Sequence, residues 1–62
     1  MIKIGEKLIN LHAVNWVDLK KGEDEWELRI IFNSGLILRI PYASEIAAQY
    51  DYTGIHERMV NL

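Results

Sequence analysis

The chain has 62 residues, of which half are hydrophobic and 26% are charged, with no cysteine and a formal net charge of −2. This composition is typical of a single folded domain spanning residues 1–62, and it excludes a disordered tail, a disulfide-linked scaffold and a thiolate zinc site. A chain this short buries only about 60% of the surface that its unfolded form exposes, so self-association is the most economical remaining source of stability.

The first residues predict a short β-hairpin. Ile2 and Ile4 are spaced to share one face of a strand. Gly5 and Glu6 follow as a two-residue turn, which brings Ile9 opposite Ile2. We therefore expect the chain to open with two short antiparallel strands.

A further strand is predicted over residues 14–19. It follows a turn at Asn10, whose side chain is suited to capping nearby backbone groups. Its inward face stays open at this stage, because Trp16 and Val17 are both apolar and point to opposite sides. The polar residues 20–24 then form a connection of the length expected between adjacent antiparallel strands.

Residues 25–41 predict a second hairpin, and the length of its turn decides the register. A two-residue turn at Ser34 and Gly35 would mix apolar and charged side chains on both faces. A three-residue turn over residues 33–35 gives one apolar face, and Gly35 supplies the left-handed backbone conformation that this turn requires. The predicted pairs on that face are Phe32 with Leu36, Ile30 with Leu38 and Leu28 with Ile40, extended by Trp26.

The same register predicts what lies on the other face of this hairpin. It sets Arg29 opposite Arg39 and Ile31 opposite Ile37. Opposed like charges are mildly destabilising unless they are neutralised, and Glu27 is the nearest carboxylate along the strand. Two interpretations of the arginines remain open, a surface ladder of ion pairs and the capture of an external carboxylate or phosphate. The isoleucines form an apolar spot that a helix, another layer or another molecule must cover.

A helix is predicted after Pro41, with Ser44 and Glu45 favouring its first turn. On a continuous helix Ile55 would lie about 140° from Tyr50, so we predict a break near Gly54 and a short second helical turn. The predicted apolar stripe of the first part consists of Ala43, Ile46, Ala47 and Tyr50.

Together these elements predict the α+β class. The architecture is a small antiparallel β-meander of three to five short strands, followed by a C-terminal helix and a short second helical turn.

The residues that could carry catalysis or bind a metal form no recognisable site. His12 and His56 lie 44 positions apart, with no ligand spacing that joins them. Ser34 falls in a turn and Ser44 at a helix start, and neither has a histidine nearby in sequence. We predict no enzyme activity, no cofactor and no metal.

The prediction is a non-enzymatic protein-protein interaction module, either a homodimer or a small accessory subunit of a larger assembly. One predicted contact surface is the outer face of the second hairpin, and the other is a C-terminal stripe whose alternative role is closure of the core. The partner-binding residues predicted are Arg29, Ile31, Ile37 and Arg39 on the hairpin, and Ile55, Met59 and Leu62 in the stripe.

The alternative function is nucleic-acid binding through a local patch of Lys20, Lys21, Arg29 and Arg39. The negative net charge gives no overall reason for such binding. No apolar run approaches the roughly 18 residues of a membrane span, and residues 1–5 lack the features of a signal peptide. The location predicted is the cytoplasm, with no membrane partner.

Overall fold

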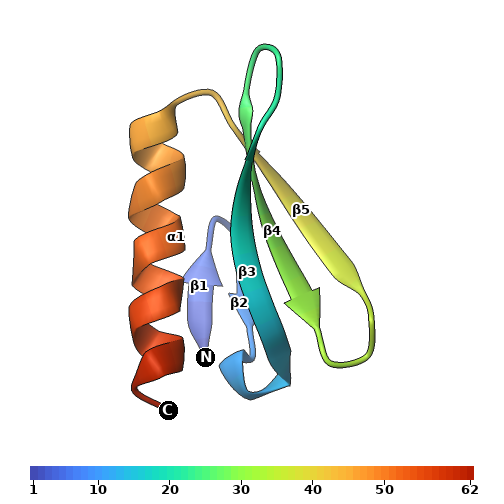
Figure 1. Cartoon of the computed structure of the whole chain (residues 1–62). Coiled ribbons are helices and arrows are strands. Elements are labelled where there is room, and N and C mark those ends of the chain that lie inside the picture. Colours follow the sequence, from blue (N-terminus) through green and yellow to red (C-terminus); the bar gives the residue numbers. More distant parts are fainter.

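The computed structural model covers residues 1–62 and contains five strands, one short 3-10 helix and one α-helix (Figure 1). The elements in chain order are β1 (Ile2–Ile4), β2 (Lys7–Ile9), the 3-10 turn (Leu11–Ala13), β3 (Val14–Lys21), β4 (Trp26–Phe32), β5 (Ile37–Tyr42) and α1 (Glu45–Val60). β1 and β2 form a two-stranded sheet, and β3, β4 and β5 form a separate antiparallel meander. The predicted α+β class, with an antiparallel meander and a C-terminal helix, is confirmed.

The opening hairpin has the predicted register. Ile2 pairs with Ile9, and Gly5 adopts a φ of 60° that an L side chain disfavours. The side chain of Asn10 then accepts a hydrogen bond from the backbone N–H of His12 at 3.1 Å. Local turn chemistry therefore determines the course of the first part of the chain.

The hairpin of β4 and β5 confirms the three-residue turn. Phe32 donates its N–H to the carbonyl oxygen of Leu36 at 2.8 Å, and Gly35 has a φ of 94°. The pairs that follow are Ile30 with Leu38, Leu28 with Ile40, Arg29 with Arg39 and Ile31 with Ile37, as predicted. Trp26 is partly buried at the end of β4 and lies outside the core cluster.

The orientation of β3 follows from a bulge near its start. Val14 pairs with Phe32 and Trp16 with Ile31, so Asn15 is an extra residue in the ladder. Val17 packs against the core, whereas Trp16 is 57% exposed on the opposite side. The bulge thus answers the question that the sequence left open about these two side chains.

The core lies between the meander and a layer made of α1 and the β1–β2 hairpin. Leu28, Ile30 and Ile55 are fully buried, and each contributes about 1.5–3 kcal/mol by removing its side chain from water. The other members of the core cluster are Ile2, Ile4, Ile9, Leu11 and Val14. Both covering elements therefore use the same face of the meander.

The helix is continuous from Glu45 to Val60, so the predicted break near Gly54 is wrong. Ser44 is the N-cap, and its side-chain oxygen accepts a hydrogen bond from the N–H of Ala47 at 3.4 Å. A glycine inside a helix costs only about 1 kcal/mol, which the burial of the neighbouring Ile55 outweighs.

The predicted apolar stripe of the helix is also wrong. Ile46 is 82% exposed and Tyr50 is 80% exposed, and neither faces the meander. The buried residues of α1 are instead Ala48 and Ile55, seven positions apart. A small side chain at Ala48 lets the first half of the helix lie close to the sheet.

Candidate interaction surface

The face of the meander that points away from α1 is covered by no other element of the chain. Leu28 and Ile30 point to the inner face, where α1 and the β1–β2 hairpin pack. Successive strand residues alternate between faces, so Arg29 and Ile31 point to the other side with their cross-strand partners. We call this surface the outer sheet face, made of Trp16, Asp18, Lys20, Glu27, Arg29, Ile31, Ile37, Arg39 and Pro41.

An apolar row crosses the outer sheet face at one end. Trp16 pairs with Ile31, and Ile31 pairs with Ile37 on the next strand. Trp16 is 57% exposed and Ile37 is 41% exposed, with Ile31 partly buried between them. Three large apolar side chains on adjacent strands therefore form one patch that is exposed to solvent. Such patches are typical of surfaces that bind other molecules.

A row of charges lies next to the apolar row. Asp18 pairs with Arg29 across β3 and β4, and Arg29 pairs with Arg39 across β4 and β5. Arg29 donates from Nε to Asp18 Oδ1 at 2.7 Å and from Nη2 to Asp18 Oδ2 at 2.6 Å. This bidentate arrangement fixes both side chains in one geometry.

The pairing with Asp18 stabilises the charged form of Arg29. The hydrogen bonds that Arg29 donates to Asp18 raise the pKa of Arg29 above its usual value, and the charges of Asp18 and Glu27 act in the same direction. The edge of this guanidinium formed by Nε and Nη2 is occupied within the chain, which makes Arg29 a poorer candidate than Arg39 for capturing an external anion. The surface-ladder interpretation of the arginines has the better support.

Glu27 neutralises the second arginine of the charged row. Its Oε1 lies 3.5 Å from Nε of Arg39, and the side chains are 31% and 55% exposed. The sequence placed Glu27 beside Arg29, whereas in the structure the direct partner of Arg29 is Asp18 and Glu27 pairs with Arg39. The charged row thus holds two carboxylates for two arginines, and Arg39 is its most exposed cation.

The predicted C-terminal stripe does not form one surface. Ile55 is fully buried in the core, and Met59 is partly buried against it. Only Leu62, which is 60% exposed, faces water. Closure of the core therefore accounts for Ile55 and Met59, and the structure leaves the outer sheet face as the candidate surface.

Sequence reasoning missed Trp16 and Asp18 as members of this surface. The signal that could have found them is the connection between β3 and β4, where Gly22 donates to the carbonyl of Glu25 at 2.8 Å. Because Gly22 pairs with Glu25, only residues 23 and 24 form the loop. This loop sets Lys21 opposite Trp26 and Asp18 opposite Arg29. The sequence leaves the register of β3 open, because all of residues 20–24 are polar or glycine and do not show where the strand ends.

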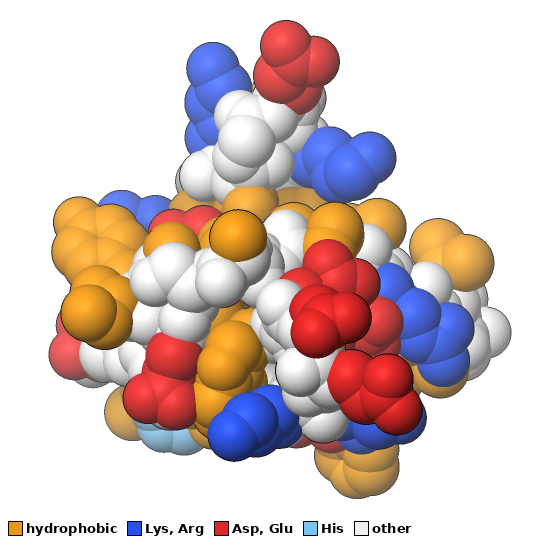
Figure 2. Space-filling view, turned by 90° about the horizontal axis from the view of Figure 1, so that it is seen from above, with side chains coloured by type: hydrophobic (Ala, Val, Ile, Leu, Met, Phe, Trp, Pro, Cys, Tyr) orange, Lys and Arg blue, Asp and Glu red, His pale blue; other side chains and the backbone are white.

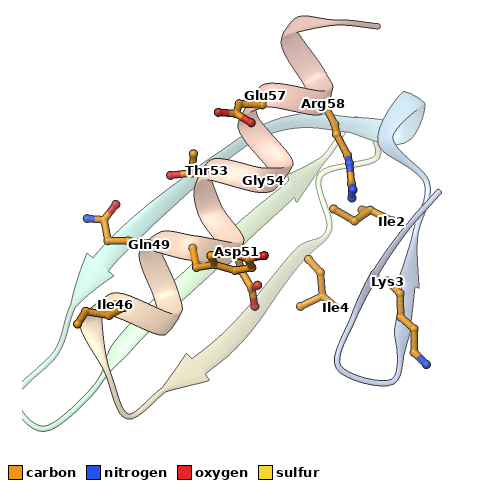
Figure 3. A pocket seen from close by; sticks show the side chains of 11 residues that line it. Ile2, Lys3, Ile4, Ile46, Gln49, Asp51, Thr53, Gly54, Glu57 and Arg58 are labelled. Atoms are coloured by element: carbon orange, nitrogen blue, oxygen red, sulfur yellow. The ribbon is translucent and has the colours of Figure 1, made fainter.

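The largest hollow of the molecule lies between β1 and α1 and has a volume of 620 Å³ (Figure 3). Lys3 and Arg58 line it together with Asp51 and Glu57, and the chain buries no charged side chain anywhere. Figure 3 shows Arg58 extending from α1 toward Ile2 on the hairpin. Of these charged side chains, Lys3, Glu57 and Arg58 are exposed and Asp51 is half-buried.

A hydrogen bond beside this hollow joins β5 to α1. The hydroxyl of Tyr42 donates to Asp51 Oδ2 at 2.5 Å. Burial and this hydrogen bond raise the pKa of Tyr42 well above its usual value, and the charge of Asp51 adds to the effect. The contact holds the end of the meander against the helix, which is a structural role.

The charge distribution gives little support to the nucleic-acid alternative. Figure 2, seen from the end of the molecule at the top of Figure 1, shows acidic and basic side chains interspersed with hydrophobic ones. Of the predicted cations, Arg29 and Arg39 are paired within the chain, and only Lys20 and Lys21 are exposed without an ion pair. A phosphate backbone needs a more extended cationic surface.

Comparisons with models of known protein families, with curated proteins and with solved structures found no match to this chain. The helix does not combine the length and the apolar character that crossing a membrane requires. No group of three or more His, Asp or Glu side chains is arranged to hold a metal ion.

Proposed function

We propose that the protein is a non-enzymatic protein-protein interaction module of the cytoplasm, either homodimeric or a small accessory subunit, that binds through its outer sheet face. The observation that carries the proposal is the apolar row of Trp16, Ile31 and Ile37 on a face that no element covers. A 62-residue chain with a core on only one side of its sheet gains most from covering the other side.

The layout of the outer sheet face matches the anatomy of protein interfaces. Such interfaces have an apolar centre that excludes water and a polar rim that fixes orientation. Here the apolar row would supply the centre, and Arg39, with its side chain 55% exposed, would supply a rim cation. The Asp18–Arg29 pair is already satisfied within the chain, so covering it would leave no unpaired charge.

The test is the solution mass of the protein by light scattering after size exclusion, over a dilution series and at two salt concentrations. The wild-type protein should associate above the 7.2 kDa chain mass, and the association should hold at the higher salt concentration. The double variant Ile31→Lys with Ile37→Glu should remain folded and lose the association that the outer sheet face provides.

The matched control is Ile46→Lys with Val60→Glu, which adds the same two charges at residues that are 82% and 71% exposed on α1. Its association should equal that of the wild type. A double variant that associates as strongly as the wild type would contradict the proposal. A wild-type monomer at every concentration would contradict the homodimeric form and leave the accessory subunit.

The alternative is a nucleic-acid-binding protein that uses Lys20 and Lys21, which are exposed at the end of β3. Salt distinguishes the two functions, because affinity that comes from phosphate contacts falls steeply between low and moderate salt. Binding of a labelled oligonucleotide that is lost in Lys20→Ala with Lys21→Ala and weakens steeply with salt would favour this alternative.

A further inference from the structure

The meander has two edges, and the backbone of β5 is unsuited to further pairing. Phe32 donates to Leu36, so the even-numbered residues of β5 direct their backbone groups toward β4 and the odd-numbered ones point outward. Pro41 stands at one of the outward positions and has no N–H to donate. A proline at such a position blunts a sheet edge against pairing with another strand.

The edge at β3 has no proline, and its bulge lies before the stretch from Val17 to Lys21. Gly22 donates to the carbonyl of Glu25, and the ladder continues as Lys21 with Trp26 and Lys20 with Glu27. Hydrogen-bonded and non-hydrogen-bonded pairs alternate along an antiparallel ladder, so every second residue of β3 turns its N–H and C=O away from β4. These outward residues are Val17, Leu19 and Lys21.

The charges on β3 discriminate among the ways in which two copies of this edge can pair. A two-fold axis at Asp18 would set two aspartates directly opposite each other, and an axis at Lys20 would oppose two lysines. An axis at Leu19 instead sets Asp18 of each copy opposite Lys20 of the other. Opposite charges facing each other across strands are stabilising, whereas like charges are destabilising.

The same register also fits the inner face and the backbone. Leu19 of one copy lies opposite Leu19 of the other, and Val17 lies opposite Lys21. All three outward residues of each strand then find hydrogen-bonding partners. Val17 and Leu19 already pack partly buried against the core, so the apolar inner layer continues across the axis.

We propose that this protein forms a dimer in which β3 pairs antiparallel with β3 of a second copy about an axis at Leu19, joining the two meanders into one continuous sheet. α1 and the β1–β2 hairpin remain on the inner face of this sheet (Figure 1). The proposal goes beyond the proposed function, because it uses the backbone of an edge and leaves the outer sheet face free in both copies.

Amide hydrogen exchange measured by NMR at low and high protein concentration tests the pairing directly. The amides of Val17, Leu19 and Lys21 should exchange rapidly in the dilute protein and become protected as the mass rises toward twice 7.2 kDa. The amides of Ile37 and Arg39, on the free edge of β5, are the internal control and should stay unprotected.

Two substitutions at exposed residues complete the test. Lys21→Pro removes one outward N–H without touching a hydrogen bond to β4, and it should weaken dimerisation by about tenfold or more relative to Lys21→Ala. Lys20→Glu places an acid opposite Asp18 of the second copy and should weaken dimerisation more than Lys20→Gln, most strongly at low salt.

Four results would overturn the edge pairing. The first is a dimer in which the amides of Val17, Leu19 and Lys21 exchange as rapidly as in the monomer. The second is an equal association of Lys21→Pro and Lys21→Ala when circular dichroism shows both to be folded. The third is a monomer at every concentration. Association that depends on Ile31 and Ile37 but not on Lys21 would overturn this inference and support the outer sheet face.

Discussion

Asp18 and Arg29 lie directly opposite each other on β3 and β4, and both carboxylate oxygens of Asp18 accept hydrogen bonds from the guanidinium, at 2.7 and 2.6 Å. This pair allows the meander to place Arg29 opposite Arg39. Without it, two guanidinium groups on adjacent strands would share the single carboxylate of Glu27.

Replacing Asp18 with asparagine should lower the free energy of unfolding, because it leaves the opposed arginines with one carboxylate. The loss should be larger at low salt, where repulsion is screened least. Urea denaturation at two salt concentrations, in protein dilute enough to be monomeric, measures the effect. Glu27→Gln should cost less, since Glu27 lies 3.5 Å from a more exposed arginine. Equal losses for the two variants would contradict this account of the charged row.

Ile55→Ala should destabilise the protein by about 2–5 kcal/mol, which is comparable to the whole stability expected for so small a core. Ile46→Ala makes the same chemical change on the same helix at a residue that is 82% exposed, and should change stability by less than about 0.5 kcal/mol. Thermal denaturation followed by circular dichroism compares the two. Similar losses at both positions would mean that α1 does not pack through Ile55.

Gly54→Ala should stabilise the protein by about 0.5–1 kcal/mol, because a Cβ at this helical position meets no heavy atom within 4 Å. Gly35→Ala should do the opposite, since its φ of 94° strains any L side chain even though the space is open. The midpoint of urea unfolding gives the sign of each change. A destabilising Gly54→Ala would show that the helix does not run straight through this residue.

Tyr42→Phe should cost about 1 kcal/mol at neutral pH, because it removes the hydrogen bond to Asp51. Folding raises the pKa of Tyr42, so the neutral hydroxyl is favoured in the folded state. Its stabilising contribution is therefore complete below the unfolded-state pKa of about 10 and is lost as the pH rises above it. The stability of the wild type should fall more steeply than that of Tyr42→Phe above pH ~10. Parallel pH profiles for the two proteins would contradict the assignment.

The register of β4 and β5 could be predicted because two independent signals agree. Alternation of apolar residues from Trp26 to Phe32 defines one face, and only a three-residue turn ending at Gly35 keeps that face apolar across both strands. The outer positions of Ile31 and Ile37 followed from that register. The turn that ends at Gly35 and the alternation of apolar residues were therefore sufficient to predict that Ile31 and Ile37 lie on the candidate surface.

The remainder depended on tertiary contacts that local patterns do not encode. The bulge between Val14 and Trp16 shifts the alternation of β3 by one residue, so the spacing of these two residues does not show the exposure of Trp16, which follows only from the register set by the loop before β4. Helix propensity predicted a break at Gly54, whereas burial of Ile55 between the helix and the sheet keeps the helix continuous. Ile46 and Tyr50 have the spacing of a core-facing stripe, yet both are exposed. The spacing of apolar residues on a helix does not by itself show which of them face the core.

The shared core of Ile2 and Ile55 has a consequence for the order in which the protein folds during its synthesis. The meander ends at Tyr42, whereas the helix that covers it ends only at Val60. Until the helix docks, only the β1–β2 hairpin can cover the inner face around Leu28 and Ile30, and the edge of β3 is unpaired. The chain at that stage is a partly covered sheet, and it is then most prone to pair with the strands of other chains.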